Sequence, residues 1–572
     1  MLNSKDRKPF IHITTVMLLA LIASSAVMWI YLNGPLQGDI NNHILTSEKY
    51  GIPQSMQERG IEPFMKGQKE LGWDGQFYYY ISNDLLGVTD IPRHIDSIAY
   101  RYQRIGLPLL ANIVSKVTFQ SWVTPTIYYL TSLLLVILAS GAAALFFSER
   151  NVNPYYALFW TLGLGTQITL VNGLPDAAAD ALLILALTSL ARGKLKTYGI
   201  TILLAALSRE AYVIIPCSIL LGILVREIQI NGIKVVYVAR ELFRIVMQNY
   251  VHWIPILLFG AWHVYVRAHF NQSPSSQAHG ILGAPLAATF DYLMAGINGD
   301  HPKVGPGQAA HKEAAAILSY LLLLFLVAKG SFALVSNEII KKERNNLNDL
   351  RLGVGIAFIL IVGLYICFGD TVMFHHTGFL KAANIFIFLL PFMAALSNTR
   401  LKKFIISFLV LTVIFHFNLL GDRIAPLGLT SYYAPPQKVE YVDKQPACLT
   451  NFSSRLTPSF DFKWLKQAHI LEVNTVFENL SDKPFSPYQG AGTVRLSYHW
   501  LEKKTNKVLQ DGLRTDLPKT LPPGHSLSLD MKIQFPESAG EYILVLSPVQ
   551  EGCAWFYMVD PSTSIRIPMD IH

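Results

Sequence analysis

Long apolar runs recur through the first 420 residues of this 572-residue chain, and they limit its fold more than any other feature. A helix needs about 20 mostly apolar residues to cross a hydrocarbon core of about 30 Å. Charged residues form only 15% of the chain, whereas about 25% is usual in soluble domains. We therefore predict an α-helical polytopic membrane protein with about eleven transmembrane helices. The runs lie near residues 11–32, 123–147, 155–173, 176–191, 197–208, 211–225, 250–268, 315–335, 352–368, 378–396 and 403–420.

Two of these runs allow more than one interpretation. The first follows the basic stretch MLNSKDRKPF but ends in NGPLQGD, without the small-residue pattern of a cleavage site, so we expect a retained helix. The runs at 197–208 and 211–225 are short and meet at Arg209, where a re-entrant pair would fit as well as two full spans.

Basic residues mark one side of the predicted helices. Cytoplasmic loops of membrane proteins carry an excess of Lys and Arg. This bias predicts a cytoplasmic N-terminus and an extracytoplasmic C-terminus. The same residues account for the net charge of +8 and favour anionic membrane lipid, not nucleic acid, as their partner. They are Lys5, Arg7, Lys8, Arg192, Lys194, Lys196, Arg226, Lys234, Arg240, Arg244, Lys341, Lys342, Arg344, Arg351, Arg400, Lys402 and Lys403.

A second domain is expected after the apolar runs end. Runs such as GTVRLSYHWLE and GEYILVLSPV alternate with turn signals such as PPGH, which predicts an all-β sandwich in residues 421–572, after a membrane domain in residues 1–420. Cys448 and Cys553 would pair in an oxidising compartment, but their spacing leaves a disulfide open. Four aromatic residues suit either a sugar-stacking surface or, as we prefer, the core. They are Tyr498, Trp500, Trp555 and Phe556.

The predicted first outside loop, residues 34–122, holds an acid and two arginines next to lipid. Ionisable groups in that position are costly unless they are used, so Asp74, Arg101 and Arg104 form a candidate site. Apolar residues repeat every four positions from Trp73, which predicts an interfacial helix, and residues 105–117 form a second candidate. The alternative is that the whole segment only anchors the chain to the membrane surface.

Further charged residues fall at the outside ends of predicted helices. Arg209 could hold a phosphate or be neutralised by the adjacent Glu210, and Lys381 opens a late helix. Asp176 and Asp180 share a helix face, where they could bind a divalent ion, hold an arginine or favour the helix N-terminus. His375 and His376 lack further ligands at convincing spacing for a metal. The loop at 271–308 is rich in Gly, Pro and Ser, which suggests a flexible lid.

The motifs WDGQFYY and YRYQR, after a first span from an inside N-terminus, resemble those of polytopic GT-C glycosyltransferases. YHWLE, DGLRTDLP and EGCAWF are similar to motifs in a C-terminal β domain of some bacterial members. The resemblance implies inverting sugar transfer from a polyprenyl-phosphate donor to a glycan, lipid or protein acceptor, on the outer face of a bacterial inner membrane, with the β domain periplasmic. No motif identifies a cofactor, and a divalent metal stays open.

The resemblance also implies roles for individual residues. Asp74 matches the family's acid and would be the general base, whereas Asp39 competes for this role because it lies just outside the first span, where other members keep their acid. Independently of the resemblance, Asp176 is a further possible second acid, as Asp39 would be if Asp74 is the base. Guanidinium groups bind phosphate oxygens in pairs, so the donor phosphate would be held by basic residues. These are Arg101, Arg104, Arg209 and Lys381, of which Lys381 stands where family members often have Arg and lacks the paired donors of a guanidinium. The alternatives are a non-catalytic glycan translocase, a polysaccharide-assembly protein or a structural subunit.

Overall fold

The chain forms two compact units, Met1–Pro435 and Pro436–His572, each described by itself. The boundary expected after Leu420 and the predicted run at 403–420 lie outside the described residues. The computed structural model describes residues 4–34, 36–64, 72–231, 247–274, 280–301, 305–306, 308–340, 346–374, 378–396, 448–465, 470–486, 493–518, 520–536 and 538–571.

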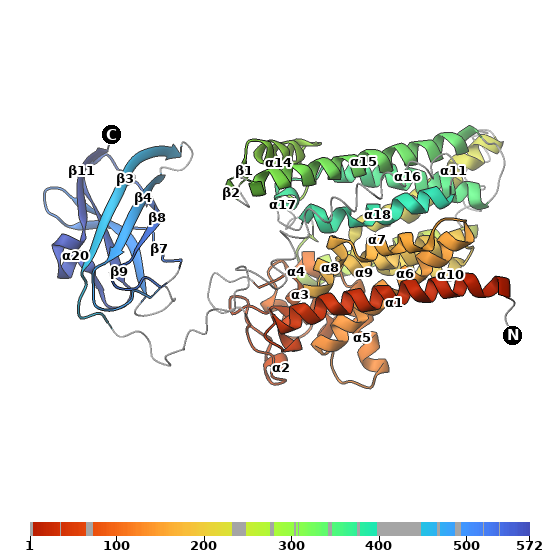
Figure 1. Cartoon of the computed structure of the whole chain (residues 1–572), viewed down its shortest axis with the longest axis horizontal. Helices are drawn as coiled ribbons and strands as arrows, with labels where there is room; N and C mark the ends of the chain where they lie inside the picture. Colours follow the sequence, from red (N-terminus) through yellow and green to blue (C-terminus); the bar gives the residue numbers. More distant parts are fainter. Residues whose placement is uncertain are drawn as a thin grey trace. The chain divides into compact units, whose positions relative to one another are not determined.

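The first unit is a bundle of long apolar helices (Figure 1). Leu, Ile, Phe and Ala fill its core, where large side chains such as Trp160 and Tyr212 are fully buried. The long helices are α1 (Ser4–Asn33), α6 (Pro125–Glu149), α9 (Asp176–Ala191), α10 (Leu195–Ser208), α11 (Ile214–Asn231), α13 (Tyr250–Phe270), α15 (Gln308–Ile340), α16 (Asn346–Ile366) and α18 (Gly378–Leu396).

Five helical stretches in the described part of the chain are long and apolar enough to cross a membrane, fewer than the eleven runs predicted. They are Ile11–Asn33, Pro125–Glu149, Glu210–Gln229, His311–Ile339 and Gly378–Leu396. Shorter apolar helices occur at Gly106–Val117, Leu195–Ser208 and Leu350–Ile366. Several predicted spans are thus helices that are too short, or not apolar enough, to count among these five.

The predicted span at 155–173 is wrong as a continuous helix. It is broken into α7 (Ala157–Thr161) and α8 (Leu164–Val171). At the break, Asn384 Nδ2 on α18 donates to the Trp160 carbonyl oxygen at 3.1 Å and to Thr166 Oγ1 at 2.6 Å. Gly163 lies so close that a Cβ there would be 2.2 Å from Asn384 Oδ1. A side chain from a neighbouring helix therefore bonds backbone that the broken helix leaves exposed.

Contacts at the helix ends show that the chain direction alternates along the first helices, with α1 parallel to α7 and α8, and α6 parallel to α9. His12 and Tyr155 meet near the starts of α1 and α7, and Tyr31 and Asn172 meet near the ends of α1 and α8. Glu149, the last residue of α6, likewise pairs with Arg192, which directly follows α9. The starts of α1 and α7 therefore lie at one end of the bundle, and the ends of α1 and α8 lie at the other. We call the end that contains Tyr31 and Asn172 the site end.

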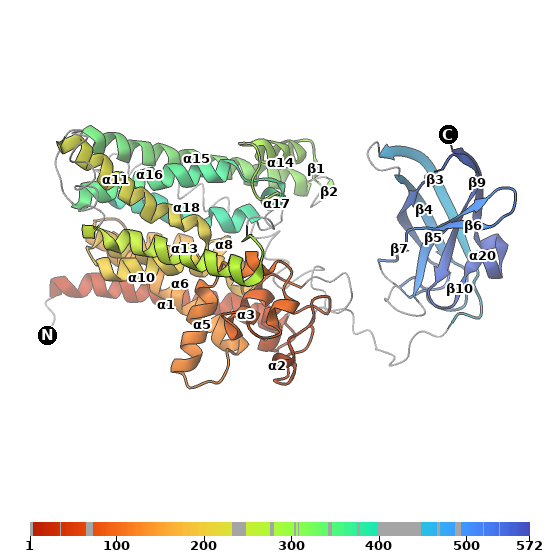
Figure 2. The same ribbon diagram turned by 180° about the vertical axis from the view of Figure 1, so that it is seen from behind.

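The segment between α1 and α6 covers the site end, and the helix that follows Trp73 is buried in protein, not interfacial as predicted. α3 (Gly75–Asn83) is buried from Gly75 to Ser82, including Tyr78, Tyr79 and Tyr80. The apolar spacing reflected packing on all sides rather than one lipid face. α5 (Gly106–Val117) is one-sided, with Ile113 and Val117 exposed. The second half of α13 lies beside this segment (Figure 2). Trp262 Nε1 on α13 donates to the Tyr102 carbonyl oxygen at 2.9 Å.

The loop predicted as a lid contains ordered structure. It includes α14 (Ala287–Ile297) and a two-stranded pair, β1 (Asp300–His301) with β2 (Gly305–Pro306). Backbone hydrogen bonds fasten it to the segment before α18, from Gly283 N to the Cys367 oxygen and from Gly369 N to the Ile281 oxygen, both at 2.8 Å. Residues 275–279 lie outside the described part.

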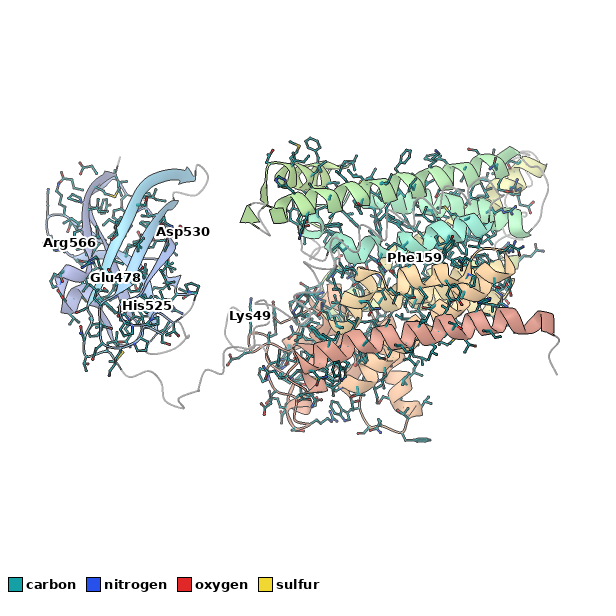
Figure 3. All side chains as sticks on the ribbon, viewed as in Figure 1. Lys49, Phe159, Glu478, His525, Asp530 and Arg566 are labelled. Carbon is teal, nitrogen blue, oxygen red and sulfur yellow. A yellow bond between two sulfur atoms is a disulfide. The ribbon has the colours of Figure 1, made fainter. Side chains whose placement is uncertain are left out.

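The second unit is a β-sandwich, in agreement with the prediction. One sheet has the order β3-β4-β8 and carries Glu478 and Asp530 (Figure 3). The other has β10-β9-β5-β6, with β11 also on β9 and β7 on β5. The strands are β3 (Ser454–Leu465), β4 (Ile470–Asn479), β5 (Val494–Glu502), β6 (Val508–Asp511), β7 (Thr515–Asp516), β8 (Ser526–Gln534), β9 (Gly540–Gln550), β10 (Ala554–Trp555) and β11 (Ile565–Ile571).

The aromatic residues of the sandwich mainly form its core. Tyr498, Trp500 and Phe556 are fully buried, which confirms their predicted role. Trp555 is only partly buried and packs against the His499 ring, with 3.8 Å between ring centroids. A disulfide joins Cys448 to Cys553 and resolves the open alternative.

Candidate functional site

Two glycines place Asp74 at the site end. Asp74 occupies the N-cap position of α3, directly before Gly75. A Cβ on Gly75 would lie 2.0 Å from the Asn172 carbonyl oxygen, and Gly72 has φ +63°. Both positions therefore require glycine, because a side chain would clash or strain the backbone. The short WDG turn leaves Asp74 with a side chain that is 50% exposed.

Arg101 is held by two carboxylates at once. Its Nη2 and Nη1 lie 2.9 Å from Asp74 Oδ1 and Oδ2, and its Nε and Nη2 lie 2.9 and 2.8 Å from Asp96 Oδ1 and Oδ2. The guanidinium also stacks over the Phe77 ring, 5.0 Å from its centroid. The Arg101 side chain is only 8% exposed. It is therefore a fixed positive charge, with Asp74 as its more exposed partner.

Arg104 repeats this arrangement with Glu210. Arg104 Nε and Nη2 bond Glu210 Oε2 and Oε1 at 2.8 and 2.7 Å. Arg104 Nη2 also donates to the Tyr100 hydroxyl at 2.9 Å. Burial raises the pKa of Tyr100 to about 12, against the opposing charge of Arg104, so this phenol stays neutral near neutral pH. α4 (Ile98–Tyr102) ends before Arg104, yet the two arginines share one partner, the hydroxyl of Tyr78.

Arg209 belongs to a second cluster, which is more buried than the pairs around Asp74. One interpretation of the sequence paired Arg209 with Glu210, but Glu210 pairs with Arg104 instead. Arg209 lies 3.5 Å from Asp180 Oδ1 and 3.8 Å from Asp176 Oδ1. Of the three roles considered for the paired aspartates, they hold an arginine, and Asp176 also lies in the first turn of α9, where it favours the helix N-terminus. Tyr212 and Trp160 also donate hydrogen bonds to Asp180. The break between α10 and α11 is what turns Arg209 toward these aspartates.

Electrostatics link the two clusters. Asp176 interacts with the positive charges of Lys381, Arg209 and Arg104 and with the negative charge of Glu210. Among the described residues Lys381 forms no ion pair or hydrogen bond, although its neighbours 375–377 are outside the described part. One charge network therefore extends from the first loop to the start of α18.

Asp39, the competing acid, has a local role. Its carboxylate accepts a hydrogen bond from Asn41 N at 2.9 Å and caps a short 3₁₀ helix, Ile40–Ile44. It is exposed, and no ion pair joins it to a described arginine. Within the described ranges no group of three or more His, Cys, Asp or Glu could hold a metal ion. His375 and His376 lie outside these ranges.

The network contains five carboxyl groups and four basic side chains. An anion therefore cannot simply add to it; it must displace a carboxylate from a guanidinium. Sequence reasoning missed Asp96, the partnership of Glu210 with Arg104, and the shared hydroxyl of Tyr78. Asp96 is five residues before Arg101, but its loop gave no periodic signal.

Comparisons of the chain with protein-family models, curated proteins and solved structures found no match.

Proposed function

We propose that the protein is an inverting glycosyltransferase of the GT-C type that uses a polyprenyl-phosphate sugar. The observation that carries the proposal is the half-exposed carboxylate of Asp74 beside the fixed guanidinium of Arg101, with Arg104 sharing the Tyr78 hydroxyl. A base next to anion-binding groups is what transfer from a phosphate-linked sugar needs. The apolar helices supply a surface for the lipid tail.

The chemistry assigns one role to each group. The acceptor hydroxyl oxygen attacks the anomeric carbon while Asp74 takes its proton, a contribution of about 10²- to 10⁴-fold in such reactions. The bond from that carbon to the phosphate oxygen breaks, and its electron pair leaves with the phosphate. Arg101 and Arg104 neutralise the developing charge. Attack opposite the leaving group inverts the anomeric centre.

Donor binding also prepares the base. In the resting site Asp74 is paired with Arg101, which keeps a second carboxylate, Asp96. We propose that the donor phosphate replaces Asp74 on Arg101, while Asp96 keeps the arginine in place. Asp74 then loses its cationic partner, and this raises its affinity for the acceptor proton. Arg209 and Lys381 contribute longer-range positive charge.

The finer topology belongs to the same proposal. About eleven crossings would leave the N-terminus in the cytoplasm of a bacterium and both the site end and the β-sandwich on the periplasmic side of the inner membrane. The acceptor would be a glycan, lipid or protein that the β-sandwich helps to guide. Alternation of the first passes supports this placement.

A glycan translocase is the second candidate, and one observation favours it. Arg226 and Glu338, 1% and 3% exposed, pair inside the bundle, and Arg351 also pairs with Glu338. Buried charges among helices can mark a transport path. The charge network at the site end contains more ionisable residues than this buried cluster, and it includes the half-exposed carboxylate of Asp74, so we prefer the enzyme.

The deciding experiment measures sugar transfer from radiolabelled polyprenyl-phosphate donors in membranes that contain the full chain. We expect Asp74→Asn to lower the rate by about 100-fold or more because the base is lost. Asp39→Asn is the matched control, since Asn also caps helices well, and its rate should equal wild type. Equal rates for Asp74→Asn and wild type would remove Asp74 as base. No transfer from any donor, even with cell-derived acceptors, would favour the translocase.

A further inference from the structure

The hydroxyl of Tyr78 lies between two guanidinium groups. Arg101 Nη1 and Arg104 Nη1 each donate to it at 3.4 Å. Tyr78 is only 1% exposed, and its hydroxyl proton has no acceptor among the described residues. Its oxygen is thus used twice as an acceptor, while its donor is unused.

This arrangement is selective for one kind of ligand atom. A buried O–H without an acceptor is unfavourable, and two flanking cations make a further cation unfavourable there. An anionic oxygen would satisfy the phenol and both guanidiniums together. Arg101 Nη1 already bonds Asp74 Oδ2 at 2.9 Å as well as the phenol oxygen, so the two sites adjoin. An oxygen that replaces the carboxylate arrives next to the phenol.

We propose that Tyr78 is a ligand-binding residue whose hydroxyl donates to an oxyanion held by Arg101 and Arg104. The inference rests on the proposed function only in taking that oxyanion to be the phosphate of the polyprenyl donor. Tyr78 then favours phosphate ligands because its hydroxyl donates a hydrogen bond to a phosphate oxygen. A purely structural tyrosine would only keep the two arginines at a fixed separation.

Tyr79 offers a matched control. It is the next residue on α3, is fully buried, and its hydroxyl has no hydrogen-bond partner in the described structure. Both Tyr78→Phe and Tyr79→Phe remove one buried hydroxyl and keep the ring. We expect Tyr78→Phe to bind farnesyl phosphate about 10-fold more weakly or worse, the range of a hydrogen bond to a charged group. Tyr79→Phe should bind like wild type.

The measurement is calorimetric titration of full-length protein in detergent with farnesyl phosphate. A parallel titration with inorganic phosphate separates a lipid headgroup from the free ion. Weaker binding of both ligands by Tyr78→Phe would identify a general phosphate site, and weaker binding of the lipid alone a headgroup site. Equal affinity of Tyr78→Phe and Tyr79→Phe for both ligands would overturn the proposal.

A second variant separates donation from spacing. Fluorine on a phenol makes its O–H a stronger donor and its oxygen a weaker acceptor. We expect 3-fluorotyrosine at position 78 to tighten farnesyl phosphate binding, whereas a structural role as acceptor from Arg101 and Arg104 predicts weaker binding. Weaker binding would overturn the donor role even if Tyr78→Phe failed to fold.

Failure of this inference can be told from failure of the proposed function. Phosphate binding that depends on Tyr78, without sugar transfer from any donor, would retain the anion site and reject the transferase. Sugar transfer by wild type with unchanged donor KM in Tyr78→Phe would keep the transferase and reject the role of Tyr78.

Discussion

At the scale of single residues, each arginine near Asp74 is fixed by a fork of two hydrogen bonds. Arg104 meets Glu210 through Nε and Nη2, and Arg101 meets Asp96 in the same way. A guanidinium makes such contacts because its donors are planar and rigid, and an ammonium group cannot. The position of the charge, and not only its sign, therefore depends on arginine.

We expect Arg104→Lys to lower sugar transfer by about 10-fold or more, since one fork corresponds to charge-assisted bonds of about 1.5–3 kcal/mol. Arg93→Lys is the control, because Arg93 is exposed and lies in the same loop. Initial rates in membranes with matched protein levels would test this. Full activity of Arg104→Lys would mean that a point charge is enough.

At the scale of elements, the site depends on the close contact of α3 with the connection between α8 and α9. Gly75 lies against Asn172, and Tyr128 OH donates to the Gly173 oxygen at 3.0 Å on the same connection. This contact joins the element that carries Asp74 to the one that leads into Asp176. The two acidic positions are therefore held in one rigid frame.

Gly75→Ala should disrupt that frame because its Cβ would lie 2.0 Å from a backbone oxygen that cannot move freely. We expect a loss of about 1–3 kcal/mol in stability, as for other overpacked sites, and a larger loss of transfer. The control is Gly260→Ala on α13, where a Cβ meets nothing within 4 Å. Thermal unfolding in detergent would compare them, and equal melting temperatures would argue against a rigid contact.

Sequence patterns predicted where helices and strands lie along the chain better than they predicted what packs around them. The apolar runs located most helices, and period-2 alternation located the strands of the sandwich. The burial of Tyr78, Tyr79 and Tyr80 was missed because the four-residue apolar spacing from Trp73 predicts one apolar helix face, whereas these consecutive tyrosines lie on several faces and are all buried. The break before Leu164 was missed because Asn384, more than 200 positions away in sequence, bonds the backbone there.

The candidate site was predictable in its residue types but not in its pairing. Asp74, Arg101 and Arg104 do converge, as their shared loop suggested. Glu210 instead pairs with Arg104 across a sequence separation of 106 residues, and no local spacing encodes such a contact.

At the scale of the whole molecule, each unit has its own apolar core, so we expect each to respond separately to pH. In the sandwich, burial lowers the pKa of His499 below its ordinary 6.5, although Asp511 opposes this shift. His499 also faces Arg514 and the hydroxyl of Tyr557. A proton bound at low pH is therefore held more tightly by the unfolded sandwich.

The direction in which pH changes the stability of the sandwich follows from proton linkage. A depressed histidine pKa means that the unfolded state binds more protons, so stability falls as the pH drops through 6.5 and the loss is complete below the folded pKa. The pKa of Asp511 is also lowered, by Arg514 against the effect of burial, which extends the loss toward acid. We expect the sandwich transition in calorimetry to move to lower temperature between pH 7.5 and 5. His499→Gln should reduce that shift; an identical shift would exclude His499 as its source.

The carboxylates that occupy Arg101 and Arg104 in the resting protein have a consequence for ligand supply. A ligand must outcompete groups that are tethered to the same chain and never diffuse away. Dilute free phosphate or sulfate is at a disadvantage against such internal competitors, whereas a phosphate confined to the bilayer plane arrives at high local concentration. In the proposed enzyme, selection between lipid-linked and soluble phosphate thus precedes any recognition of the sugar.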